Sequence, residues 1–98
     1  MNHDINADLL DVVQDGNIQE VEHLLNAGAN INATNKFLLT PLMLAARDGF
    51  STIVDLLLAR GADVTAREEL GYTAADIAEM NHHPEIAEKL KSVGAIRN

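Results

Sequence analysis

The sequence Thr40-Pro41-Leu42-Met43-Leu44-Ala45-Ala46 opens a unit that the chain repeats. The unit continues through Gly49 to Leu56-Leu57-Leu58-Ala59-Arg60-Gly61-Ala62. Gly-Ala pairs recur at a step of 33 residues, at Gly28-Ala29, Gly61-Ala62 and Gly94-Ala95. The same step relates Leu24, Leu57 and Leu90. A fixed period of about 33 residues is typical of a solenoid, in which identical units stack along one direction.

Each unit is predicted to hold two helices, because apolar residues recur at helical spacing while Gly and Pro stand at the boundaries. The expected helices cover about 4–15, 18–26, 41–48, 51–60, 74–80 and a last one from 84 that ends at Gly94. Asp4 or Asn6, Thr40, Ser51 and Thr73 are the expected N-caps. Residues 29–39 and 62–72 are expected to form extended loops or hairpins.

The repeated unit resembles the ankyrin repeat. Residues 34–66 match at Thr40, Pro41, Leu42, Leu44, Ala45, Ala46, Gly49, Ile53, Val54, Leu57, Leu58, Gly61, Ala62 and Ala66. Weaker matches cover residues 7–33 and 67–98, so the resemblance extends over nearly the whole chain. It implies an all-α repeat solenoid of three ankyrin repeats, an L-shaped stack of helix-turn-helix pairs whose joining hairpin-like loops line a concave face.

Several residues depart from the family pattern. Leu38 stands where the hairpin usually has Gly, Asn35 replaces Asp, and Met43 replaces His. Leu resists the positive φ that the Gly adopts, so either Leu38 is strained or this hairpin has another shape. In the last unit Asp76, Glu79 and Lys91 are among the departures that add polar groups, as in a terminal repeat facing water.

These patterns predict one domain of three repeats. The acidic stripe of the first unit and the polar changes of the last predict an N-terminal capping repeat at 1–33, a central repeat at 34–66 and a C-terminal capping repeat at 67–98. We expect a complete three-repeat protein, since three repeats are about the minimum for a stable stack.

The charge restricts the classes of partner. The formal net charge is −8, and residues 1–33 carry six acids with no Lys or Arg. Phosphate backbones and anionic membranes attract basic surfaces, so neither nucleic acid nor a membrane is an expected partner. There is no Cys, no secretory signal at the start and no long apolar segment, which together favour the cytoplasm.

Catalytic and metal-binding patterns are weak, so we expect no enzyme and no cofactor. Glu68 and Glu69 are adjacent and are predicted to point apart on a solvated hairpin. His82 and His83, joined by Asp48 or His3, form the candidate metal site. Zinc needs three or four converging ligands, which favours a surface loop instead. Asn32 lies where some ankyrin proteins are hydroxylated, but a hydrogen-bonding turn residue is the favoured interpretation.

The resemblance implies binding of a partner protein through hairpin tips and the ends of the first helices. By position, the implied partner-binding residues are Lys36, Phe37, Leu39, Arg47, Asp48, Glu69, Leu70, Tyr72, Met80 and Asn81. Phe37 aligns with Leu70 and Leu39 with Tyr72, which predicts an exposed apolar patch. The expected function is a non-catalytic, monomeric adaptor or inhibitor. The alternatives are a metal-binding protein or enzyme using His82 and His83, and a structural protein that self-associates through its tips.

Overall fold

The structure is a computed structural model that describes residues 4–97, with side chains described for residues 4–95. This part of the chain forms six helices and no strand. The helices are α1 (Ile5–Gln14), α2 (Ile18–Asn26), α3 (Pro41–Asp48), α4 (Ser51–Ala59), α5 (Ala74–Met80) and α6 (Pro84–Arg97).

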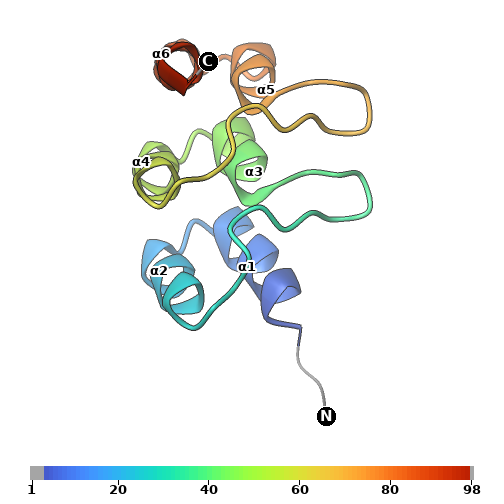
Figure 1. Ribbon diagram of the computed structural model, residues 1–98, viewed down its shortest axis with the longest axis vertical. Coiled ribbons are helices and arrows are strands. Elements are labelled where there is room, and N and C mark those ends of the chain that lie inside the picture. The colour runs from blue at the N-terminus through green and yellow to red at the C-terminus, as the bar shows by residue number, and fades with distance from the viewer. Residues whose placement is uncertain (1–3, 98) are drawn as a thin grey trace.

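The helices form two parallel columns. α1, α3 and α5 stack in one column and α2, α4 and α6 in the other, while two long loops project sideways from the first column (Figure 1). α3 packs on both α1 and α5, and the molecule measures 40 × 25 × 25 Å. The all-α repeat solenoid predicted from the sequence is therefore confirmed.

The core lies between the helix pairs and is centred on α3. Every residue from Pro41 to Ala46 is buried, because α3 has a neighbour on each side along the stack. The largest fully buried side chains are Leu9, Val13, Val21, Leu42, Met43, Leu44, Ile53, Val54 and Leu57. Packing between neighbouring units is what stabilises a solenoid, so this interior unit ties the other two together.

Two reciprocal caps begin the first-column helices that follow the loops. Thr40 Oγ1 accepts from the Met43 N–H at 3.2 Å, and Met43 Sδ accepts from the Thr40 N–H at 3.4 Å. The Thr73 hydroxyl and the Asp76 carboxylate make the equivalent pair of bonds at 3.3 and 3.0 Å. Met43 and Asp76, which stand 33 residues apart at the position where the family pattern has His, thus each complete a capping box and fix the direction in which the loop meets its helix.

The turns between paired helices require left-handed backbone. Gly16 and Gly49 have φ of 72° and 75°, and His82 adopts 65° at the equivalent position. A ring from the following unit covers each glycine: a Cβ added at Gly16 would lie 3.1 Å from the ring of Phe50, and one at Gly49 would lie 2.5 Å from the ring of His83. These glycines therefore permit close packing between units as well as the turn.

Two predicted helix ends are wrong. Ser51 is the expected cap of α4, but Phe50 occupies the N-cap and, having no side-chain acceptor, makes no cap hydrogen bond. Its ring packs against Gly16. The last helix does not end at Gly94 but continues to Arg97. Gly94 keeps helical backbone inside α6, beside Val64.

Polar side chains link successive units along the loops that follow the second-column helices. Asn32 Oδ1 accepts from the Asp63 N–H at 2.9 Å. Within the first unit, Asn6 Oδ1 accepts from the Asn30 N–H at 2.8 Å and joins α1 to the loop after α2. The Arg60 guanidinium donates to Asn26 Oδ1 at 2.6 Å. Asn32 is therefore the hydrogen-bonding residue that the sequence favoured.

Candidate interaction surface

The hairpin at residues 35–39 is organised by one amide side chain. Asn35 Oδ1 accepts from the N–H groups of Phe37 at 2.9 Å and Leu39 at 3.0 Å. Asn35 also pairs through its backbone, donating to the Leu39 carbonyl and accepting from the Leu38 N–H. The loop therefore has a defined shape before any partner arrives, because its tip donors are already satisfied.

The hairpin at residues 68–72 repeats this pattern with a carboxylate. Glu68 Oε1 accepts from the Leu70 N–H at 2.7 Å and from the Tyr72 N–H at 2.9 Å. The backbone bonds between Glu68, Gly71 and Tyr72 match those of the first hairpin. Glu68 thus supports the loop of an exposed hairpin, a role that the sequence did not predict.

Leu38 is strained inside a hairpin of unchanged shape. Its φ is 65°, and the equivalent Gly71 has φ of 92°. Left-handed backbone costs a residue with a Cβ about 1 kcal/mol relative to its usual regions. Of the two possibilities that the sequence left open, the structure therefore shows the first.

The two tips lie side by side. The Glu69 N–H donates to the Phe37 carbonyl at 3.0 Å, which joins one hairpin to the next. The apolar side chains at these tips are largely exposed: Phe37 by 48%, Leu38 by 50%, Leu70 by 78% and Tyr72 by 41%. We call these four residues the hairpin patch. Sequence reasoning omitted Leu38 from the site, although its replacement of a tip glycine was the signal that marked it.

Leu39 does not belong to this exposed surface. It is half-buried and packs against the core, so the expectation that it would stand exposed like Tyr72 is wrong. Leu39 immediately precedes the buried cap Thr40, and its backbone is held at both N–H and carbonyl by Asn35. The chain is thereby drawn toward the helices at Leu39, while Phe37 and Leu38 stay outside.

The other implied binding residues lie around the hairpin patch or at the far ends of α3 and α5. The Lys36 ammonium lies 5.2 Å from the centre of the Phe37 ring. Arg47 binds Asp48 through two hydrogen bonds of 3.0 and 3.2 Å, so these two residues satisfy each other. Met80 is half exposed, and the Asn81 amide donates to the Ile77 carbonyl at 2.8 Å.

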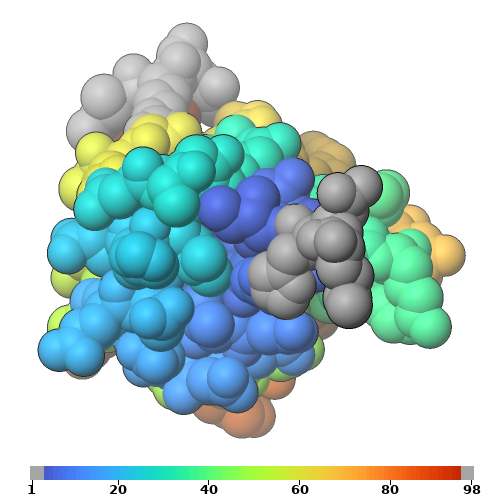
Figure 2. Space-filling view, turned by 90° about the horizontal axis from the view of Figure 1, so that it is seen from below, coloured from blue at the N-terminus to red at the C-terminus, as the bar shows by residue number. Residues whose placement is uncertain are grey.

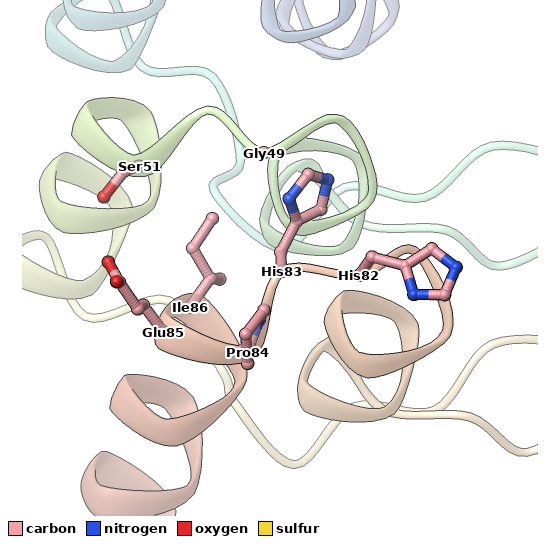
Figure 3. A pocket seen from close by; sticks show the side chains of 7 residues that line it. All are labelled: Gly49, Ser51, His82, His83, Pro84, Glu85 and Ile86. Atoms are coloured by element: carbon pink, nitrogen blue, oxygen red, sulfur yellow. The ribbon is translucent and has the colours of Figure 1, made fainter.

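The two adjacent histidines diverge. A shallow cavity of about 270 Å³ lies between the turn at Gly49 and the start of α6. The His83 ring points toward Gly49, whereas His82 points away from it (Figure 3). His83 Nε2 is 3.2 Å from the Arg47 carbonyl, a hydrogen bond that holds the ring against the preceding unit. His83 thus has a packing role.

The potential metal ligands His, Asp and Glu are distributed over residues 4–97. No three His, Cys, Asp or Glu side chains in that range converge on a point that could hold a metal ion. His3, a further candidate ligand in the sequence, lies outside the described residues. None of the helices over the same range is long and apolar enough to cross a membrane.

Known proteins share this sequence pattern. A family model described as ankyrin repeats in many copies matches residues 24–78, more than half of the chain. The chain is 32% identical over 93 residues to the ankyrin repeat-containing protein F37A4.4 of Caenorhabditis elegans, covering 92% of this chain and 8% of that protein.

Two further relatives carry names that describe an activity. The mitochondrial disaggregase of Homo sapiens is 35% identical over 77 residues, covering 79% of this chain and 11% of that protein. The ARF GTPase-activating protein Git of Drosophila melanogaster is 37% identical over 79 residues, covering 80% and 11%. The chain therefore spans about a tenth of the length of these relatives. Stacked helix pairs, joined hairpins and the match to the family model together show that the chain belongs to the ankyrin-repeat family.

Proposed function

We propose that this chain is a non-catalytic module that binds a partner protein across its two hairpin tips. Ankyrin repeats are in general protein–protein interaction modules. The observation that carries the proposal is the hairpin patch: four apolar side chains exposed on two loops that a backbone hydrogen bond joins. Exposed apolar clusters with aromatic members are typical of binding surfaces.

Rigidity of the hairpins supports this function. Asn35 and Glu68 each hold two tip N–H groups, and Glu69 bonds to the neighbouring hairpin. A surface that is ordered in advance loses little conformational entropy when a partner docks. The module can act in this way either as an adaptor or as an inhibitor that covers its partner.

The proposed binding surface combines the hairpin patch with Lys36 and Glu69 beside it and with exposed residues at the far ends of α3 and α5. Lys36, Glu69, Met80 and Asn81 are exposed, and the Arg47–Asp48 pair stands at the far end of α3. In this arrangement the patch supplies most of the binding energy and the polar residues determine orientation, as in other interfaces with an apolar centre and a polar rim.

Matched serine variants test the proposal. The double variant Phe37→Ser/Leu70→Ser removes apolar area from both tips, whereas Ile18→Ser removes an exposed apolar side chain from α2, on the opposite side of the stack (Figure 1). Proteins captured by the wild type should be lost from the double variant and retained by Ile18→Ser. Equal capture by all three would contradict the proposal, and thermal unfolding of each variant checks that the fold persists.

The same samples show whether the protein associates with itself. Light scattering of the wild type against concentration should show a monomer. Growth in mass that the double variant abolishes would show instead that the hairpin patch binds a second copy of this chain, which would contradict a dedicated partner.

A further inference from the structure

Within residues 4–95, every Lys and Arg side chain contacts another group of the same molecule. Six of the seven Lys and Arg residues of the chain lie in this range. The contacts are Lys36 with the Phe37 ring, Arg47 with Asp48, Arg60 with Asn26, Arg67 with the Gly71 carbonyl, Lys89 with Asp55 and Lys91 with Glu79.

Many of the negative charges are not engaged. Over residues 4–95, acidic side chains without a hydrogen bond or ion pair are Asp11, Asp15, Glu20, Glu22, Glu69, Glu85 and Glu88. Four of these seven lie in the first helix pair, which has no Lys or Arg. Arg47, Lys89 and Lys91 are neutralised by carboxylates. Lys36, Arg60 and Arg67 contact neutral groups and keep their charge. The seven unpaired carboxylates outnumber these three cations, so an approaching partner meets a net negative surface over the described residues.

Glu69 places one unpaired carboxylate within the hairpin patch. Its backbone N–H bonds to the Phe37 carbonyl and its neighbour in sequence is Leu70, so it stands where the two tips meet. Its side chain is exposed and has no partner among residues 4–95. Near it, Lys36 lies over the Phe37 ring and Arg67 faces the Gly71 carbonyl at 3.5 Å.

We propose that the segment that docks on the hairpin patch is a basic peptide segment of the partner protein, with an apolar side chain on Phe37 and Leu70 and a Lys or Arg beside it on Glu69. This inference rests on the proposed function and adds the chemistry of the partner. An apolar contact next to an ion pair gives both affinity and register, because the charge selects one of several positions along an otherwise uniform apolar surface.

The first helix pair adds attraction at longer range. Figure 2 looks onto α1 and α2, which fill this end of the molecule, and the hairpin around Phe37 protrudes beside them. Their acids act over about 8 Å at physiological salt, so they chiefly accelerate the approach of a basic segment. The contact at Glu69 instead acts on the bound state.

A library of random linear peptides, displayed on phage and selected on the wild-type protein, tests this chemistry without knowledge of the natural partner. Enriched peptides are synthesised, and their binding is measured by fluorescence anisotropy to the wild type and to Phe37→Ser/Leu70→Ser. Peptides that need the patch should pair an aromatic or aliphatic residue with Lys or Arg, and their affinity should fall severalfold between about 0.05 M and about 0.5 M NaCl.

Two charge-reversal variants distinguish a local contact at Glu69 from an effect of the protein's net charge on binding. Glu69→Lys and Glu22→Lys change the net charge equally, but Glu22 lies on α2, in the column away from the hairpins (Figure 1). Glu69→Lys should weaken patch-dependent peptides about tenfold, and Glu22→Lys less than about twofold. Both variants should unfold at the wild-type temperature, since neither carboxylate makes a hydrogen bond or ion pair within the described residues.

The outcomes separate the two proposals. Patch-dependent peptides that lack basic residues, or that bind Glu69→Lys as tightly as the wild type, overturn the inference and leave the proposed function standing. Selection that yields no peptide sensitive to Phe37→Ser/Leu70→Ser contradicts the proposed function itself. Basic peptides lost from both Glu69→Lys and the patch variant, and retained by Glu22→Lys, support both.

Discussion

The hairpins at residues 35–39 and 68–72 reach the same backbone shape with different side chains. An amide oxygen of Asn35 and a carboxylate oxygen of Glu68 each accept from two tip N–H groups. At the left-handed position the first hairpin has Leu38 and the second has Gly71. This hairpin shape therefore needs a side-chain oxygen that can reach the tip N–H groups and a tip residue at positive φ. More than one residue type can serve at each position.

The difference lies in the strain that each hairpin carries. Gly71 adopts its φ freely, whereas Leu38 is disfavoured there and also exposes half of its side chain to water. Neither property helps the isolated fold. A strained, exposed apolar residue at a loop tip is expected where a partner contacts it, which agrees with the proposed role of the hairpin patch.

The largest expected effect comes from removing the acceptor of the first hairpin. Asn35→Ala leaves the N–H groups of Phe37 and Leu39 without their side-chain acceptor and should lower the free energy of unfolding by about 2 kcal/mol. Urea denaturation measures the change, with the neighbouring exposed Thr34→Ala as control. A loss no greater than that of Thr34→Ala would mean that this hairpin does not depend on Asn35.

The next largest change in stability should come from placing a leucine at the positive-φ position of the second hairpin, as in the first. Nothing lies within 4 Å of a Cβ added at Gly71, so Gly71→Leu meets the conformational penalty alone. We expect a loss of about 1 kcal/mol in the free energy of unfolding, the same penalty that Leu38 carries in the first hairpin. A neutral result in urea denaturation would show that the second hairpin can adopt another shape, which the first cannot do without losing its bonds to Asn35.

Relieving the strain should stabilise the protein. Leu38→Gly removes the penalty at φ of 65° and should raise the free energy of unfolding by about 0.5–1 kcal/mol, because the greater flexibility of Gly when unfolded offsets part of the gain. Thermal unfolding shows the sign. The exchange variant Leu38→Gly/Gly71→Leu should lie near the wild type, and a large loss in it would indicate that the two positions are not equivalent.

The smallest expected effect on stability comes from removing the charge of Glu68 while keeping its hydrogen-bonding oxygen. Glu68→Gln keeps an oxygen that can accept from the Leu70 and Tyr72 N–H groups, as the amide of Asn35 does in the first hairpin. The unfolding free energy should change by less than about 0.5 kcal/mol. A loss above 1.5 kcal/mol, which is about the strength of a hydrogen bond to a charged acceptor, would show that the carboxylate charge is required.

Periodic and local features of the fold were predictable from the sequence, and features that depend on neighbouring units were not. Thr40 and Thr73 cap their helices as predicted, because an N-cap bonds to residues only three positions away. Ser51 failed as a cap because the ring of Phe50 packs on Gly16, in another unit. Gly94 failed as a helix end because a glycine terminates a helix only where a left-handed turn follows.

The candidate interaction surface was likewise only partly predictable from the sequence. Periodicity placed Phe37 level with Leu70 on successive hairpins, and both are exposed. The alignment of Leu39 with Tyr72 was equally good, yet Leu39 turns inward. Burial of one side chain depends on the packing of several segments, and a match in register carries no information about it.

By itself, the sequence determined the period, the helix pairs and the family, because a repeat is encoded many times over and local errors do not alter it. Only the tertiary structure decided which side chains are free to meet a partner. The bond from Glu69 to Phe37 and the pairing of Lys89 with Asp55 and of Lys91 with Glu79 join residues 12 to 34 positions apart. A charge is free, or an apolar side chain exposed, only if no distant segment packs against it. Those contacts depend on the three-dimensional fold, so the sequence alone does not reveal them.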